Sequence, residues 1–155
     1  MSHGTFAIDT QPGHLVRPIL IGGAIAGALD LTSAFITFGW GVPRNVAAGL
    51  LGASAVSGGT FTWILGVLLH FTIAIGAATI YCLVSRKLPF LGDHWLVCGM
   101  FFGIAVHLVM NLVVLPLCAF HFMGPYEYRS LLQGILVHMT IIGLPISFSL
   151  HKLAR

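Results

Sequence analysis

Five polar side chains interrupt long apolar stretches of this 155-residue chain: Asp30, His70, His107, Asn111 and His138. A carboxylate and an imidazole that face one another stabilise each other's charged form, and histidine exchanges protons near neutral pH. Neutral imidazoles are also common ligands of metal ions and haem. These residue types therefore favour either a proton-responsive cluster or a ligand-binding centre.

The elements that must position these side chains are four apolar runs, at residues 19–40, 60–84, 95–117 and 131–150. A helix of about 20 residues crosses roughly 30 Å of hydrocarbon. Backbone polar groups in lipid must be satisfied within the segment, so each run is expected to be a helix. We predict an all-α integral membrane four-helix bundle. Its single membrane domain occupies residues 19–152, after a cytoplasmic N-terminal arm of residues 1–18.

The composition excludes most soluble functions. Hydrophobic residues make up 57% of the chain and charged residues 7%, whereas a soluble domain carries about 25% charged residues. No basic cluster points to nucleic acid, so the expected partner is the lipid bilayer. Cys82, Cys98 and Cys118 are isolated and are interpreted as small apolar residues. No nucleophile triad, phosphate-binding loop or pair of catalytic acids is recognisable, and we do not expect an enzyme.

Basic residues in the loops predict the orientation of the chain. Five of the seven lie on one side of the predicted topology, and only Arg44 and Arg129 lie on the other. By the positive-inside rule, both termini are cytoplasmic. Aromatic residues that prefer the membrane interface fall near the predicted ends of the spans: Trp40, Trp63, Trp95, Tyr126 and Tyr128.

A shorter apolar segment, about residues 43–56, lies between the first two spans. It is too short to cross the bilayer, Pro43 can begin a helix there, and Gly58 with Gly59 can end it. Two placements are open, a helix that lies in the outer interface or a re-entrant helix that covers the bundle.

The ionisable residues in the spans fall at a similar depth. Asp30, His70, His107 and His138 each lie nine to eleven residues from the outer end of their span, which is about 15 Å of helical rise. Asn111 follows His107 by one turn. Because intramembrane polar groups normally face the interior of a bundle, we expect one polar cluster in which Asp30 faces a histidine.

Small residues predict how the helices pack. Two GxxxG pairs, Gly23 with Gly27 and Gly99 with Gly103, lie in the cytoplasmic halves of the first and third spans. We expect these two spans to pack closely there and the bundle to widen outward into a small polar chamber. The alternative use of the pairs is homodimerisation. Pro116 and Pro145 are expected to kink the third and fourth spans.

Three functions are compatible with this pattern. The cluster could set helix packing and sense pH or stress, or it could belong to a conduit for protons, ions or a small solute. A third alternative is haem or metal binding through His70, His107 and His138, although no span contains paired histidines at ligand spacing. We expect no cofactor. Against a conduit, few polar residues continue toward the cytoplasmic side: Tyr81, Ser85, Ser147 and Ser149.

Several segments together resemble a known family: AGALDLTSA, AAGLLG, SGG, LLHFTIAIGAATIY, MNLVVLPL and LVHMTIIGLPIS. They are similar to small, uncharacterised bacterial inner-membrane proteins that are loosely YagU-like, over roughly residues 19–150. The resemblance places Asp30, His70, Asn111, Pro116, His138 and Pro145 on motif positions. His107 departs from the pattern, in which an aromatic residue is usual, and this weakens a three-histidine metal site. The resemblance implies a multi-pass protein of the bacterial inner membrane, and a suggested link to acid tolerance would suit a titrating Asp/His core.

Overall fold

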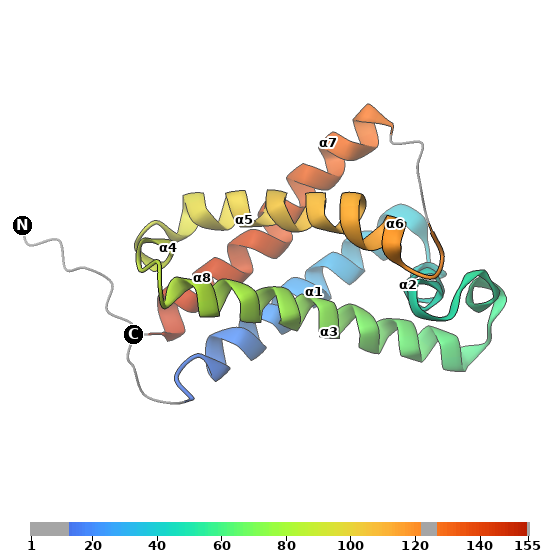
Figure 1. Cartoon of the computed structure of the whole chain (residues 1–155), viewed down its shortest axis with the longest axis horizontal. Helices are drawn as coiled ribbons and strands as arrows, with labels where there is room; N and C mark the ends of the chain where they lie inside the picture. The colour runs from blue at the N-terminus through green and yellow to red at the C-terminus, as the bar shows by residue number, and fades with distance from the viewer. Residues whose placement is uncertain (1–12, 122–126, 155) are drawn as a thin grey trace, which may run out of the picture.

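The computed structural model describes residues 13–121 and 127–154. Within these ranges the chain is helical and contains no β-strand. Four helices are long and apolar enough to cross a membrane, Val16–Phe38, Thr60–Ser85, Trp95–Leu117 and Tyr128–Leu153. The predicted all-α, four-helix membrane bundle is confirmed (Figure 1). Most of the predicted N-terminal arm and the interfacial residue Tyr126 lie outside the described residues.

Several of the spans are composed of consecutive helical segments. In chain order the elements are α1 (Val16–Phe38), α2 (Val42–Leu51), the 3₁₀ helix η1 (Ala53–Ser57), α3 (Thr60–Ser85), α4 (Phe90–Asp93), α5 (Trp95–Val109), the π-helical η2 (Met110–Val114), α6 (Leu115–Leu117), α7 (Tyr128–Val137), the π-helical η3 (His138–Gly143) and α8 (Leu144–Leu153). The start of α1 and the end of α8 lie at one end of the bundle, and α2 lies at the opposite end (Figure 1).

Glycines set two of the helix ends. The first span ends at Phe38 rather than at the expected Trp40, because Gly39 has a φ of +82° that a helix does not continue through. Gly52 has the same φ and ends α2 at Leu51. The predicted short helix is therefore divided, α2 being followed by η1.

The helices pack in the order α3, α1, α8 and α5. The principal contacts are those of α1 with α3, of α1 with α8, and of α5 with η3 and α8. Within the described residues α3 and α5 are not a closely packed pair. Bulky side chains line both sides of the space between them at one end, including Ile80, Phe101 and Phe102.

The glycine pairs do contact neighbouring helices, but different ones from those expected. A methyl group on Gly23 would lie 2.8 Å from the Cα of Ile75, and one on Gly27 would lie 3.0 Å from the ring of Phe71. Both of those neighbours belong to α3. Gly23 and Gly27 therefore join the first span to the second.

Gly99 and Gly103 join the third span to the fourth. A methyl group on Gly103 would overlap the backbone of His138, and one on Gly99 would overlap Ser147. Gly143 in turn lies against the backbone of Gly99. The predicted packing of the first span against the third at these glycines is wrong, because the first pair contacts the second span and the other pair contacts the fourth.

A π-helical turn precedes each of the two predicted kink positions. Pro116 follows η2 and Pro145 follows η3. A proline within a helix cannot donate a backbone hydrogen bond to the carbonyl four residues earlier, so the ladder must adjust locally. These adjusted turns contain two of the polar residues, Asn111 in η2 and His138 in η3.

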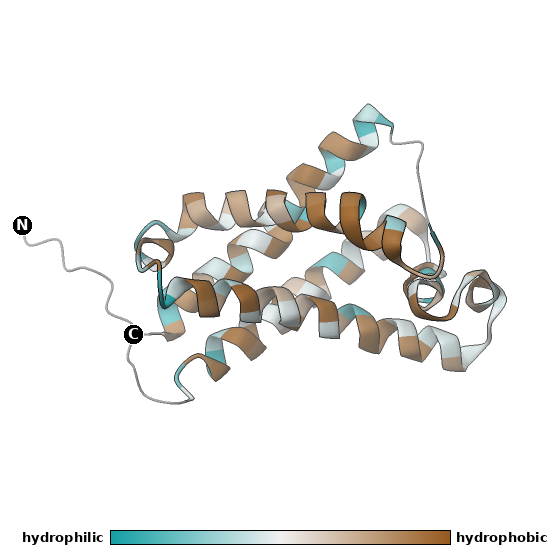
Figure 2. Cartoon of the chain, in the orientation of Figure 1, coloured by the Kyte–Doolittle hydropathy of each residue, from teal (hydrophilic) through white to brown (hydrophobic). Residues whose placement is uncertain are grey.

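Apolar residues recur along the whole length of the long helices (Figure 2). Large hydrophobic side chains face outward on every span, for example Ile36, Leu68, Phe101 and Leu136, which are 82%, 61%, 68% and 61% exposed. At one end Trp40 and Trp63 stack with ring centroids 5.1 Å apart, and at the other Trp95 packs on Phe148 at 5.1 Å. An apolar belt with aromatic residues at both ends is typical of a multi-pass membrane protein.

Candidate functional site

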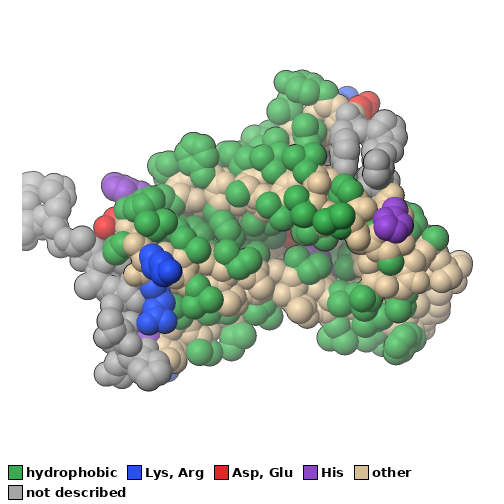
Figure 3. Space-filling view, viewed as in Figure 1, with side chains coloured by type: hydrophobic (Ala, Val, Ile, Leu, Met, Phe, Trp, Pro, Cys, Tyr) green, Lys and Arg blue, Asp and Glu red, His purple; other side chains and the backbone are tan. Residues whose placement is uncertain are grey.

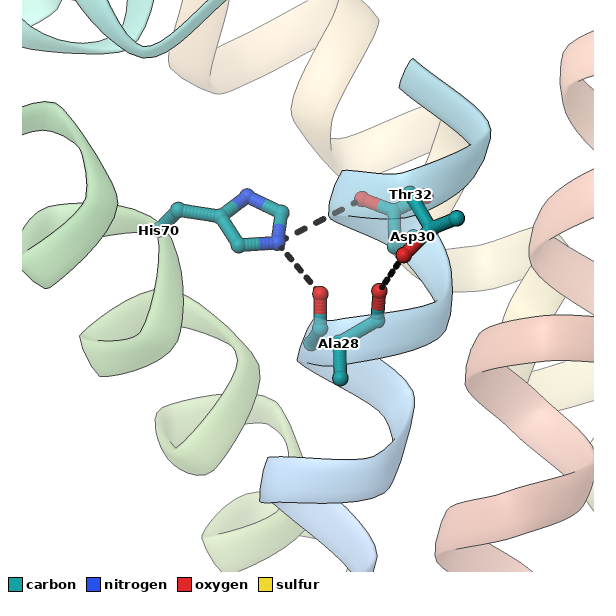
Figure 4. Close-up of polar contacts among 5 residues, drawn as sticks. Ala28, Asp30, Thr32 and His70 are labelled. Carbon is teal, nitrogen blue, oxygen red and sulfur yellow. Dashed lines mark hydrogen bonds and ion pairs between the residues drawn. The ribbon is translucent and has the colours of Figure 1, made fainter. Parts of the chain in front are cut away.

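Asp30 of α1 and His70 of α3 face one another beside the cavity wall that α2 contributes to. The Oδ2 atom of Asp30 lies 3.9 Å from Nε2 of His70, and the side chains are only 21% and 14% exposed. Figure 4 shows Asp30 and His70 from the two helices. The same Nε2 atom lies 3.0 Å from the carbonyl oxygen of Gly27, one turn before Asp30. The expected Asp–His contact is therefore present, and a backbone carbonyl completes it.

The Gly27 carbonyl determines the tautomer of the neutral His70 ring. A carbonyl oxygen only accepts hydrogen bonds, so Nε2 of His70 carries the hydrogen and donates it. Nδ1 is then an acceptor while the ring is neutral, and a second proton on it creates an imidazolium beside the Asp30 carboxylate. The geometry can thus hold one additional proton as part of an ion pair.

A second polar group joins the third and fourth spans. The rings of His107 and His138 are in edge-to-face contact, with centroids 4.7 Å apart. His107 is buried at 6% exposure, and its ring lies against Gly134, where a methyl group would overlap it. Nδ2 of Asn111 donates to the carbonyl of His107 at 2.9 Å. The polar residues therefore form two pairs on neighbouring helices instead of one compact cluster.

His138 also has a defined tautomer. Its Nδ1 atom lies 2.8 Å from the carbonyl oxygen of Gly134 and must donate to it. Nε2 of the neutral ring is consequently an acceptor. In both His70 and His138, a carbonyl of a glycine takes the N–H of the ring and leaves the other nitrogen able to accept a proton or a hydrogen bond.

A cavity of about 280 Å³ connects the two pairs. Asp30, His70 and His138 line it, together with apolar side chains of α3, α5 and the segments η2 and α6. The surface is hollowed between α5 and α3 at this level (Figure 3). The Asp30–His70 pair and His138 of the second pair therefore share one internal space.

The helix α2 covers one end of this cavity. Asn45, Val46, Gly49 and Leu50 contribute to its wall. Gly66 of α3 lies against the backbone of Pro43, and the N–H of Ala119 donates to the carbonyl of Gly49 at 2.9 Å. The structure thus has a chamber at the level of the polar residues, but most of its walls are apolar, and α2 is fastened across its end between the second and third spans.

The three histidines considered as metal ligands are not gathered at one point. His70 lies with Asp30, whereas His107 and His138 form the other pair. Across residues 13–121 and 127–154, no group of three His, Cys, Asp or Glu side chains is arranged to hold a metal ion. The three cysteines are all free.

The hydroxyl groups on the side predicted to be cytoplasmic donate to backbone carbonyls. Ser85 donates to the carbonyl of Cys82 at 2.7 Å, Ser147 to that of Leu144 at 3.1 Å, and Tyr81 to that of Leu91 at 3.1 Å. Each bond joins the hydroxyl to a nearby carbonyl in the chain. These residues therefore do not extend the polar pairs into a continuous path.

Two parts of the site were not identified from the sequence. The first is the carbonyl of Gly27. Gly27 lies three residues before Asp30 on the same helix, and this spacing could have indicated that a partner of Asp30 also reaches that carbonyl. The second is the part of the cavity wall contributed by α2. It could not be predicted, because no local pattern indicates which end of the bundle a short apolar helix will cover.

Comparison with protein-family models, with curated proteins and with solved structures finds no match to this chain.

Proposed function

We propose that this multi-pass membrane protein responds to pH through the two polar pairs. The observation that carries the proposal is that Asp30, His70 and His138 line one cavity. Oδ2 of Asp30 lies 3.9 Å from Nε2 of His70, and the ring centroid of His138 lies 4.7 Å from that of His107. The ionisable groups at this level are contributed by α1, α3, α5 and η3. A structural or stress-related role in the membrane follows from such a response.

Protonation acts on the two pairs with opposite sign. A proton on His70 creates a cation next to the Asp30 carboxylate, which stabilises the contact between α1 and α3. Protons on both His107 and His138 place two positive charges in contact, which destabilises the packing of α5 on η3. Acidification therefore tightens one side of the cavity and loosens the other.

The test is thermal unfolding of the full chain in detergent between pH 8 and pH 5, compared with Asp30→Asn. At pH 8 the two proteins should have similar midpoints. Toward pH 5 the variant should become less stable than the intact protein, by about 1–3 kcal/mol, because a charged His70 then lacks its partner. Glu127→Gln, which removes an exposed acid before α7, is the matched control.

Parallel pH profiles of Asp30→Asn and the intact protein would overturn the proposal. Measurement of flux into proteoliposomes across the same pH range separates the pH-response proposal from the conduit alternative. A conduit would give a flux of protons or solute higher than that of protein-free vesicles. We do not adopt the conduit, because the cytoplasmic hydroxyls are bonded to nearby carbonyls.

We place the protein in the bacterial inner membrane with both termini cytoplasmic. The loop charges and the resemblance to YagU-like proteins support this location. The location also agrees with the pH response, since the pairs then lie nearer the outer face, where the external pH varies.

A further inference from the structure

The cavity beside the two polar pairs has the properties of a binding site for a small lipophilic molecule. We propose that it takes a molecule whose apolar part occupies the space between α3 and α5 and whose polar end donates hydrogen bonds, as an amine or a hydroxyl does. The inference rests on the proposal that the polar pairs are functional, and it adds the chemical class of what they bind.

The apolar part of the ligand follows from the walls. Along α3 the lining residues are Leu69, Ile73, Ala74 and Ala77, and along the third span they are Val106, Met110, Val114 and Leu115. These side chains offer no hydrogen bonds except through the thioether of Met110, a weak acceptor. At about 280 Å³ the space is large enough for a short alkyl chain or a single ring system.

The polar end follows from the tautomers. Nε2 of His70 and Nδ1 of His138 already donate to carbonyls, at 3.0 and 2.8 Å. The remaining nitrogen of each neutral ring and the Asp30 carboxylate are acceptors. The lining also contains Asn45, whose amide both donates and accepts, and Cys118. Near the Asp30 carboxylate, the grouped acceptors favour a donor, above all a cationic one, and disfavour a second carboxylate.

The route of entry follows from the packing. Because α3 and α5 are not closely packed, the cavity opens between them, and Figure 3 shows the hollow on that face. Two of its wall residues, Ile73 and Val114, are 42% and 37% exposed on this side. Since α2 covers the end, a ligand enters sideways, from among the lipid chains.

The binding test uses the full chain in lipid nanodiscs at one fixed pH, with octylamine, 1-octanol and octanoate as probes. A ligand that binds only the folded protein raises its thermal midpoint. We expect octylamine and octanol to raise the midpoint by a few degrees and octanoate to leave it unchanged. A shift with octylamine alone identifies an amine ligand, and a comparable shift with octanol identifies a hydroxyl ligand. Equal shifts with all three probes, or none with either donor, would overturn the proposal.

A pair of variants on one helix locates the site. Ile73→Trp fills the cavity and should abolish the shift, whereas Ile64→Trp, at a 50% exposed position of α3 outside the cavity, should retain it. Retention of the shift in Ile73→Trp would show that the probes act through the bilayer and would contradict the proposal.

A labelling experiment covers the case in which Ile73→Trp does not fold. A diazirine-bearing alkylamine, photolysed with the intact protein, should form adducts at Ile73 and Met110. Adducts confined to outward residues such as Ile64 would contradict the site. Because these measurements use a single pH, failure of binding is distinguishable from failure of the pH response.

Discussion

At the scale of the residue, the polar groups depend on backbone carbonyls as much as on one another. His70 and His138 each donate to a carbonyl of glycine, Gly27 and Gly134. A glycine has no side chain to shield its carbonyl, so a ring from the same or a neighbouring helix can approach it. The rings are thereby oriented, and the groups left over are acceptors for a proton or a ligand.

A substitution of His107 tests the role of the His107–His138 pair. Replacement by Phe, the kind of residue that the family resemblance leads one to expect, keeps an aromatic ring against Gly134 and removes one of the two charges that acid would create. We expect His107→Phe to lose less stability than the intact protein between pH 8 and pH 5 in thermal unfolding. His94→Phe, at an exposed position before α5, should leave the pH profile unchanged. An unaltered profile in His107→Phe would assign the acid response to other groups.

At the scale of the element, glycines decide which helices are neighbours. The backbones of α5 and the fourth span approach so closely that a methyl group on Gly103 would overlap the backbone of His138 and Met139. That contact also sets the separation of the His107 and His138 rings, because both side chains arise from the same interface. Packing and the polar pair are therefore coupled.

Gly103→Ala should destabilise the protein by about 1–3 kcal/mol, the usual cost of overpacking. The measurement is chemical or thermal unfolding in detergent. Gly76→Ala in α3 is the control, because a methyl group there meets nothing within 4 Å. That substitution should be neutral or stabilising by up to about 1 kcal/mol, since alanine favours the helix. Equal effects of the two substitutions would contradict the close contact.

Gly66→Ala should loosen α2 from α3, because the new methyl group would occupy the place of the Pro43 carbonyl. Cys118 lies beside Gly49 of α2 and should then react faster with a maleimide. Cys82 is fully buried and should stay protected in both proteins. Mass spectrometry of the labelled peptides measures both rates, and an unchanged rate at Cys118 would show that α2 is held by other contacts.

At the scale of the whole molecule, the bundle is closed on three sides and open on the fourth. The contacts of α3 with α1, of α1 with α8, and of α8 with α5 close three sides. Between α3 and α5 the rings of Tyr81 and Phe102 meet at 4.8 Å, and the space beside the polar pairs stays open. Tyr81 and Phe102 also face a second apolar hollow of about 300 Å³ along that side. A bundle of this shape offers an internal site to molecules dissolved in the membrane.

The orientation of the bundle has its own test. An alkaline phosphatase fused after Arg155 should be inactive and a green fluorescent protein there should fluoresce, because the loop charges predict a cytoplasmic C-terminus. Phosphatase fused near Trp40, at the other end of α1, should be active. The reverse pattern would invert the proposed topology without altering the bundle.

The sequence alone determined the spans and the types of residue they contain. Apolar runs of about 20 residues must form helices in lipid. The predicted first, second and fourth spans therefore end within three residues of the observed helix ends, and the predicted bounds of the third span agree with the observed ones. The similar depth of Asp30, His70, His107 and His138 also follows from helical rise. Those are properties of single segments, which local composition and geometry control.

Only the tertiary structure decided which helices are neighbours and what the polar residues contact. A GxxxG pair predicts a close approach but does not identify the partner, which is why Gly23 and Gly99 were assigned to the wrong interface. The division of the polar residues into two pairs, the placing of α2 across the cavity and the opening between α3 and α5 depend on side chains from different helices at once. Packing between segments is a joint property of the surfaces that meet, and no single segment contains it.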